Sequence, residues 1–278
     1  RTTHSMSSIA RECNLSVPTI FRLFKYISYT NTHMPEVLSI DEFKGNAGRK
    51  FQCILTDPKS RKVLDILEGR EHYILSDYFR QYNDRNNVKY FVMDMWKPYK
   101  DIAETYFKNA TIMIDKYHFI RQITWAFDRI RRDLQKELHP HRRKYFKRSR
   151  WLLLKRMCKL TDNQKAAANV MLDASTKLSD AYMLKEKFYE FVDSSSYEEA
   201  VRKLKAWYMF VSVSDIPAFN NCMQTIINWE PYILNSFRCP YTNGYTEGVN
   251  NKIKVLKRNA YGVKNFDRFR TRILHVMA

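Results

Sequence analysis

Three acidic residues occupy positions where a carboxylate could do chemistry. Asp41 lies inside an apolar strand pattern, where a charged side chain is costly unless it is paired or binds a metal. Asp94 ends another strand, at the edge where open α/β sheets place their ligands, and Glu247 opens a helix. Each acid alone could equally be a capping or ion-paired residue. Together they predict a site for Mg²⁺ or Mn²⁺, which prefer hard oxygen ligands. Two such ions about 4 Å apart can clamp the attacking and leaving oxygens of a phosphodiester.

The segment Asp115-Lys-Tyr-His118 follows an expected strand and precedes an expected helix. Asp115 could cap this helix, and His118 could reach the carboxylates or a phosphate. A single histidine here is also compatible with a structural role, so both interpretations stay open. We predict that His118 is a secondary residue of the active site.

The helix that begins near Glu247 has two different faces. Asn243-Gly244 indicates a turn before it, and Thr246 is the expected N-cap. Apolar residues on one face can pack inward, while amides and basic residues recur on the other face at steps of three and four. A solvated amphipathic helix has the same pattern, but this face also suits contacts with a DNA backbone, which orient DNA without reading its sequence. The predicted DNA contacts are Asn250, Asn251, Lys254 and Lys257.

Two short helices are expected at residues 8–14 and 17–24, joined by a turn at Leu15-Ser16. Ser16 can cap the second helix. This is the spacing of a helix-turn-helix, whose second helix enters the DNA major groove, although an ordinary helical hairpin fits as well. Thr19 and Arg22 are the candidates that would face the groove. The expected core of this segment is Ile9, Leu15, Ile20 and Leu23.

The next part of the chain alternates between strand and helix signals. The expected strands are 37–43, 50–56, 62–68, 88–93 and 110–114, with a turn at 45–48 and helices at about 74–83 and 100–107. Three antiparallel strands followed by a strand-helix-strand unit predict a mixed sheet flanked by helices. If the first and fourth strands are neighbours, Asp41 and Asp94 converge at the sheet.

From about residue 118 to residue 233 the pattern is helical. The segment 121–156 is the most basic of the chain, and its interleaved aromatic residues suit a nucleic-acid backbone with stackable bases. For any single arginine in it, a solvated helix face is the alternative. Further helices are expected at about 162–174, 178–191, 197–210 and 215–228, then Pro231 and Pro240 as breaks, and a last helix at about 267–276.

The composition favours a polyanionic partner. Among 278 residues, 48 are Lys or Arg and 29 are Asp or Glu, which gives a net charge of +19. Such a surface attracts nucleic acid first and anionic membranes second. No run of 18 apolar residues is present, so no segment is expected to span a membrane. The five scattered cysteines have neither zinc-site nor disulfide spacing and fit a reducing cytoplasm.

Four motifs together resemble the transposases of the ISL-three insertion sequences, in the same order over about residues 37–274. They are Ser39-Ile-Asp-Glu-Phe43, Val92-Met-Asp-Met-Trp-x-x-Tyr99, Ile114-Asp-Lys-Tyr-His-Phe119 and Thr242-Asn-Gly-Tyr-Thr-Glu-Gly-Val-Asn-Asn-Lys-Ile-Lys254, of which the last is the most specific. The resemblance implies a ribonuclease H-like catalytic core, with Asp41, Asp94 and Glu247 on the positions of an Asp-Asp-Glu triad. It also implies that Asp115-x-x-His118 is the Asp/Cys-x-x-His signature of related transposases.

The resemblance also organises the chain into domains. The helical region looks like the all-α insertion that such families place before the catalytic Glu. Family members carry a cysteine-rich zinc-binding segment ahead of the helix-turn-helix, so a chain that begins at Arg1 is expected to be truncated. The expected domains are a helix-turn-helix segment at 1–34, a first part of the catalytic core at 35–120, a helical insertion at 121–238 and a last part of the core at 239–278.

The predicted function is that of a DNA transposase. A metal-activated water would nick DNA at the end of the element, and the released 3′-hydroxyl would attack target DNA. The expected cofactor is Mg²⁺ or Mn²⁺, and the expected partner is double-stranded DNA, as transposon ends and target. We expect a homodimer in the bacterial cytoplasm, associated with the nucleoid. The alternatives are a non-catalytic DNA-binding regulator or domesticated transposase remnant, and a ribonuclease H-like nuclease or resolvase.

Overall fold

The chain divides into two compact units. The computed structural model describes residues 4–45, 51–148, 150–260 and 265–277. The first unit joins Arg1–Asp115 to Tyr241–Ala278, and the second unit is Lys116–Pro240. Most of the expected turn at 45–48, and the expected first residue of the second strand, Lys50, lie outside the described residues.

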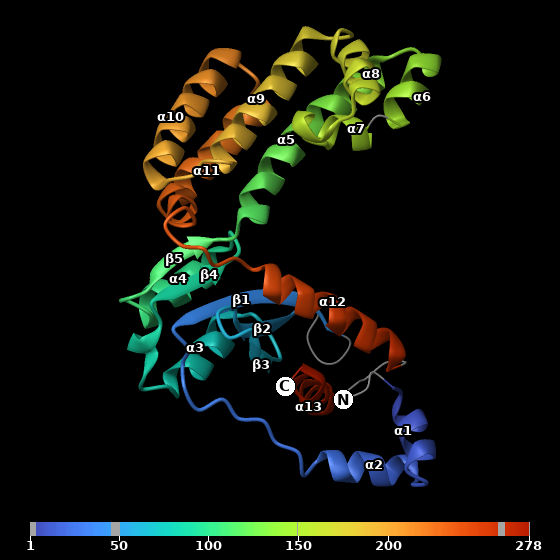
Figure 1. The fold of residues 1–278 in the computed structure, drawn as a ribbon, viewed down its shortest axis with the longest axis vertical. Coiled ribbons are helices and arrows are strands. Elements are labelled where there is room, and N and C mark those ends of the chain that lie inside the picture. The colour runs from blue at the N-terminus through green and yellow to red at the C-terminus, as the bar shows by residue number, and fades with distance from the viewer. Residues whose placement is uncertain (1–3, 46–50, 149, 261–264, 278) are drawn as a thin grey trace. The chain divides into compact units, whose positions relative to one another are not determined.

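A five-stranded mixed sheet forms the centre of the first unit (Figure 1). Its strands are β1 (Val37–Lys44), β2 (Phe51–Asp57), β3 (Lys62–Leu67), β4 (Tyr90–Met93) and β5 (Thr111–Ile114), in the spatial order β3-β2-β1-β4-β5. The first three strands pair antiparallel, whereas β4 is parallel to β1 and β5 is parallel to β4. The structure therefore confirms the expected mixed sheet, including the neighbouring first and fourth strands.

Helices of the first unit cover both faces of this sheet. They are α1 (Met6–Glu12), α2 (Val17–Phe24), α3 (His72–Arg80), α4 (Lys97–Tyr106), α12 (Gly244–Asn259) and α13 (Phe266–Met277), with a short 3-10 helix η1 at Arg85–Asn87. On one face, Ile253 of α12 and Phe269 of α13 share a buried cluster with Ile54 of β2. On the other face, the ring of Phe107, which follows α4, lies 5.1 Å from Phe91 of β4 and 5.0 Å from Phe79 of α3.

The two N-terminal helices form the expected hairpin. Ser16 is the N-cap of α2 and accepts a 3.2 Å hydrogen bond from the backbone N–H of Thr19. The expected core of this hairpin is wrong in part, because Leu15 and Leu23 are 42% and 49% exposed. A pair of helices this short cannot bury every apolar residue. The aromatic side of α2 faces α13 instead, where the guanidinium of Arg268 lies 4.6 Å from the ring of Phe21.

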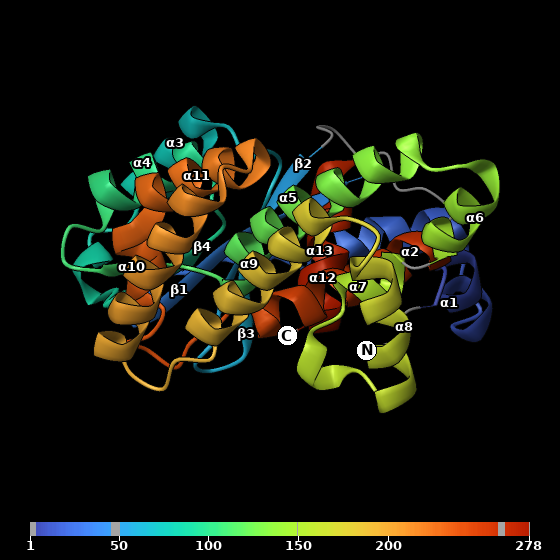
Figure 2. The ribbon, with the colours of Figure 1, turned by 90° about the horizontal axis from the view of Figure 1, so that it is seen from above.

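The second unit is built from helices, as expected. They are α5 (Lys116–Glu137), α6 (Pro140–Arg148), α7 (Arg150–Leu154), α8 (Asp162–Leu172), α9 (Thr176–Val192), α10 (Tyr197–Ser214) and α11 (Pro217–Asn235), with a 3-10 helix η2 at Met157–Lys159. Helices α9, α10 and α11 pack side by side (Figure 1 and Figure 2). In their core the indole N–H of Trp207 donates a 2.9 Å hydrogen bond to the carbonyl of Leu184. None of the described helices combines the length and the apolar character that crossing a bilayer requires.

The expected break at Pro231 is wrong, because this proline lies inside α11, which continues to Asn235. Proline costs a helix one backbone hydrogen bond. Ile233 and Leu234, in the next turn, are buried. Their packing favours continuing the helix past the proline, which the local sequence rule does not take into account.

Candidate active site

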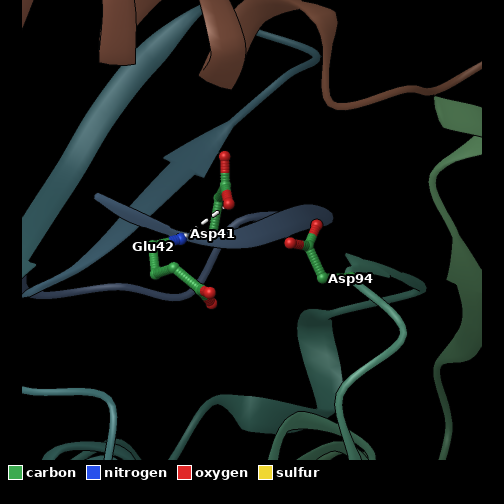
Figure 3. A group of neighbouring side chains, drawn as sticks. All are labelled: Asp41, Glu42 and Asp94. Atoms are coloured by element: carbon green, nitrogen blue, oxygen red, sulfur yellow. Dashed lines mark hydrogen bonds between the residues drawn. The ribbon is translucent and has the colours of Figure 1, made fainter. Parts of the chain in front are cut away.

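Asp41 and Asp94 lie close together because β1 and β4 are neighbouring parallel strands in the middle of the sheet. In this pairing residues 37–39 lie opposite residues 90–92, and continuing the register by two residues sets Asp41 opposite Asp94. Since β4 ends at Met93 and β1 runs on to Lys44, Asp94 can turn toward β1. One oxygen from each of Asp41, Asp94 and Glu42 lies within 4.8 Å of the other two (Figure 3).

Asp41 and Glu42 belong to opposite faces of β1, because successive side chains alternate along a strand. Figure 3 shows their side chains extending to opposite sides of the strand, with Asp94 beside both. Asp41 pairs across the sheet with Ile54, which belongs to the cluster under α12. Glu42 pairs with Cys53, whose sulfur lies 3.9 Å from the Tyr99 hydroxyl of α4. We call the group formed by Asp41, Glu42 and Asp94 the acidic edge. It has one side that faces α12 and one side that faces α4.

On the α4 side, Glu42 is held by two donors. Arg70 Nη1 donates to its Oε1 at 2.6 Å, and the Tyr99 hydroxyl donates to its Oε2 at 3.2 Å. The guanidinium of Arg70 lies between two aromatic rings, 4.2 Å from the centre of Phe51 and 4.4 Å from that of Trp96. This is the geometry of an ion pair fixed by stacking. No pattern in the sequence groups Glu42 with Asp94, and only the geometry of the sheet brings the two together.

Burial and, to a smaller extent, the neighbouring acids raise the pKa of Tyr99 and of Cys53. Burial raises the pKa of the Tyr99 hydroxyl well above its usual range, and the neighbouring Cys53, Glu42, Asp41 and Asp94 raise it further. Burial likewise raises the pKa of the Cys53 thiol, again supported by Asp41 and Glu42. Tyr99 therefore stays protonated at neutral pH and remains a hydrogen-bond donor to Glu42.

On the α12 side, Asp41 contacts the helix that carries Glu247. Asn250 Nδ2 donates a 2.8 Å hydrogen bond to Asp41 Oδ2, and the backbone N–H of Glu42 donates to Asp41 Oδ1 at 2.6 Å. Asn250 is buried. Its predicted contact with DNA stays a prediction, while the structure gives its amide a partner inside the protein.

Glu247 lies in the first turn of α12 with its side chain exposed. Among the described residues it is not part of the group formed by Asp41, Glu42 and Asp94. Residues three apart on a helix are neighbours, with Cβ atoms about 5–6 Å apart, so the Asn250 contact brings this end of α12 to the acidic edge. The role of Glu247 as the third acid stays a prediction.

The expected N-cap at Thr246 is wrong. Helix α12 begins at Gly244, with Asn243 as its N-cap, and Thr246 is fully buried inside the first turn. Its hydroxyl lies 3.0 Å from Ser39 Oγ and 2.8 Å from Thr56 Oγ1. These two hydroxyls belong to β1 and β2, which are far from Thr246 in sequence. Their hydrogen bonds hold Thr246 against the sheet.

Asp115 and His118 fall in different units. Asp115 follows β5, and its Oδ1 accepts a 3.0 Å hydrogen bond from the backbone N–H of Asn243 at the start of α12. His118 stands in the first turn of α5 in the second unit, is buried, and its ring centre lies 5.5 Å from that of Tyr117. The active-site role of His118 stays a prediction.

The residues predicted to contact DNA differ in their surroundings. Arg22 is exposed and donates to Thr19 Oγ1 at 3.2 Å, and exposed Lys254 donates to Asn251 Oδ1 at 3.1 Å. Lys257 donates to the carbonyl of Lys44, and burial, together with the charge of Lys44, lowers its pKa. Lys254 is therefore better placed than Lys257 to meet a phosphate.

The acidic edge fits a divalent metal by its chemistry. Asp41 is half-buried and Asp94 is only 8% exposed. Two such carboxylates repel each other more strongly than they would in water, and a divalent cation removes this repulsion. Carboxylate oxygens are the ligands that Mg²⁺ and Mn²⁺ prefer. Asp41 and Asp94 would hold such an ion.

The mixed sheet, with Asp41 inside β1 and Asp94 directly after β4, defines a ribonuclease H-like α/β protein. A family model described as transposase, that of the ISL-three insertion sequences, matches residues 38–273, so the chain belongs to this transposase family.

Two curated relatives are similar to the chain. The transposase for insertion sequence element IS1001 of Bordetella parapertussis is 29% identical over 239 residues, which is 84% of this chain and 59% of the relative. A protein of Lactococcus lactis subsp. lactis named ATP-dependent protease is 26% identical over 217 residues, which is 77% of this chain and 63% of the relative. The chain thus spans less than two thirds of the length of either relative.

Proposed function

We propose that this chain carries the catalytic core of a DNA transposase, which cleaves DNA at the ends of an insertion sequence and joins it to a target with Mg²⁺ or Mn²⁺. The observation that carries the proposal is the convergence of Asp41, inside β1, with Asp94, directly after β4, within a chain of a transposase family. Double-stranded DNA is the substrate in this proposal, and the acting species is a homodimer in the bacterial cytoplasm, near the nucleoid.

Each residue has a role that follows from its place. Asp41 and Asp94 are metal ligands, and Glu247 is the third acid, on the α12 side. When bound, the metal ions activate water and stabilise the charge that develops on the phosphodiester oxygens. Asn250 orients Asp41 through its amide. Asn251 and Lys254, on the exposed part of α12, contact the phosphate backbone and orient the DNA.

A strand-transfer assay tests the proposal. The full chain is incubated with labelled DNA that contains the ends of its insertion sequence, with a target plasmid, and with either Mg²⁺ or a chelator. The proposal predicts joined products that require the metal and disappear in Asp94→Asn. Cleavage without joining would favour a nuclease or resolvase, and DNA binding without cleavage would favour a regulator.

A further inference from the structure

Helix α12 has a buried polar face. Asn243, Thr246 and Asn250 are 1%, 0% and 7% exposed, and they recur at steps of three and four residues, so they lie on one side of the helix. A helix usually buries an apolar stripe, because a buried polar group is costly unless it is hydrogen-bonded. This face of α12 therefore depends on its partners.

Each of the three residues has hydrogen-bond partners in the strands of the sheet or directly after one of them. Asn243 donates through its backbone to Asp115 and accepts through its side chain from Ser39, Thr246 contacts Ser39 and Thr56, and Asn250 contacts Asp41. Apolar contacts are non-directional and tolerate rotation of a helix about its axis. Hydrogen bonds require distance and angle, so this set fixes both the rotation of α12 and its position along the axis.

The hydrogen bond between Asn243 and Asp115 joins the residues on either side of the second unit in the sequence. Asp115 is the last residue of the first unit before the chain enters Lys116–Pro240, and Asn243 is the third residue of the returning segment, which begins at Tyr241. The bond between them therefore joins the two points where the chain leaves and re-enters the first unit. Beside it, the ring centre of Tyr241 lies 5.5 Å from that of Tyr90 on β4.

We propose that Asp115 is a positioning residue that fixes the start of α12 and thereby sets the carboxylate of Glu247 relative to Asp41. This inference rests on the proposed function in one respect, the role of Glu247 as a metal ligand. It gives the aspartate of the Asp115-x-x-His118 motif a task that is separate from holding the metal. Glu247 directly follows Thr246 in the first turn of α12, so a small rotation of the helix would change the direction in which its carboxylate extends.

Metal binding by the full chain without DNA tests directly whether Asp115 positions Glu247. Mn²⁺ affinity is measured by electron paramagnetic resonance for the wild type, Asp115→Ala and Asp115→Asn. Changes in residues that orient metal ligands cost about 10–100-fold in metal affinity, and we expect a loss in this range for Asp115→Ala. Asp115→Asn keeps an acceptor oxygen and should recover most of the affinity. Asp77→Ala is the control for loss of one negative charge, because this aspartate is exposed on α3.

A second pair of variants removes the other partner of the bond. Asn243→Pro and Asn243→Ala both lose the side-chain amide, but only proline also loses the backbone N–H that donates to Asp115. The backbone φ of Asn243 is −75°, which a proline ring accepts. We expect Asn243→Pro to bind Mn²⁺ more weakly than Asn243→Ala.

The double variant Asp115→Ala/Glu247→Gln shows whether Asp115 acts through Glu247. If it does, the double variant should lose no more affinity than Glu247→Gln alone. The inference would be overturned if Asp115→Ala or Glu247→Gln bound Mn²⁺ with wild-type affinity. It would also be overturned if the losses of the two single variants simply added in the double variant. These results are independent of strand transfer, so an absence of DNA joining by the wild type would refute the proposed function and leave this test readable.

Discussion

Asn250 Nδ2 and Asp41 Oδ2 are joined by a 2.8 Å hydrogen bond across 209 residues of sequence. The bond connects the strand that carries the first acid of the site to the helix that carries Glu247 one turn earlier. It also places an amide, rather than a second carboxylate, directly against Asp41. The arrangement orients Asp41 without adding to the negative charge of the edge.

This bond leads to a prediction for Asn250→Leu, which keeps a similar volume and removes the amide. DNA cleavage should fall about 10–100-fold, as for other residues that orient a metal ligand, because Asp41 loses its donor. DNA affinity should change less than about twofold, since Asn250 is buried. Cleavage rates and fluorescence-anisotropy titrations measure the two quantities. A loss of DNA affinity with normal cleavage would instead support the contact between Asn250 and DNA.

The basic surface predicts that DNA affinity falls steeply with salt. The logarithm of the binding constant should decrease with the logarithm of salt concentration, with a slope of about −0.9 for each phosphate contacted. Lys254→Ala should make this slope shallower by about one unit, because Lys254 is exposed. Lys257→Ala is the matched comparison and should change the slope less, since Lys257 donates to the carbonyl of Lys44. A binding constant that does not respond to salt would argue against phosphate contacts.

The hydroxyl of Thr246 should stabilise the first unit. Thr246→Val keeps the shape of the side chain but leaves the buried hydroxyls of Ser39 and Thr56 without this partner. We expect a loss of about 1–3 kcal/mol in the free energy of opening, measured by hydrogen exchange of the β1 and β2 amides. Thr246→Ser keeps the hydroxyl and should lose less. Equal losses in the two variants would mean that packing, and not hydrogen bonding, holds this residue.

The buried Lys185 predicts how stability of the second unit depends on pH. Burial lowers the pKa of Lys185 below 10.5, although its ammonium lies 2.6 Å from Glu186. A lysine whose pKa is lower in the folded state binds its proton more tightly after unfolding, so protonation favours the unfolded state. Stability should therefore rise as the pH climbs through the lowered pKa toward 10.5. Denaturant midpoints against pH should show this rise in the wild type and a flatter curve in Lys185→Met. Parallel curves for the wild type and Lys185→Met would refute the predicted contribution of Lys185.

Local sequence patterns predicted the strands that carry the acids but not all of their surroundings. The fourth strand was expected at 88–93 and is found at 90–93, directly before Asp94. The turn signal at Asn243-Gly244 predicts Thr246 as an N-cap. The prediction is wrong because the hydroxyls that Thr246 contacts, those of Ser39 and Thr56, lie 207 and 190 residues away in sequence. No local rule brings those hydroxyls to the helix, because they are positioned by the pairing of β1 with β2.

Glu42 illustrates the same limit at the site itself. Alternation along a strand assigns it to the face opposite Asp41, which gives no reason to group the two. The group with Asp94 arises because β1 continues beyond the end of β4. The ion pair with Arg70 likewise joins residues 28 apart that have no shared motif.

We propose that Glu247, and not Glu42, completes the site with Asp41 and Asp94. The most direct measurement compares metal-dependent DNA cleavage and DNA affinity in Glu247→Gln and Glu42→Gln. We expect Glu247→Gln to abolish cleavage with nearly unchanged DNA affinity, whereas Glu42→Gln should retain measurable cleavage because the partners of Glu42 are Arg70 and Tyr99. Near-normal cleavage by Glu247→Gln, with cleavage lost in Glu42→Gln, would contradict it.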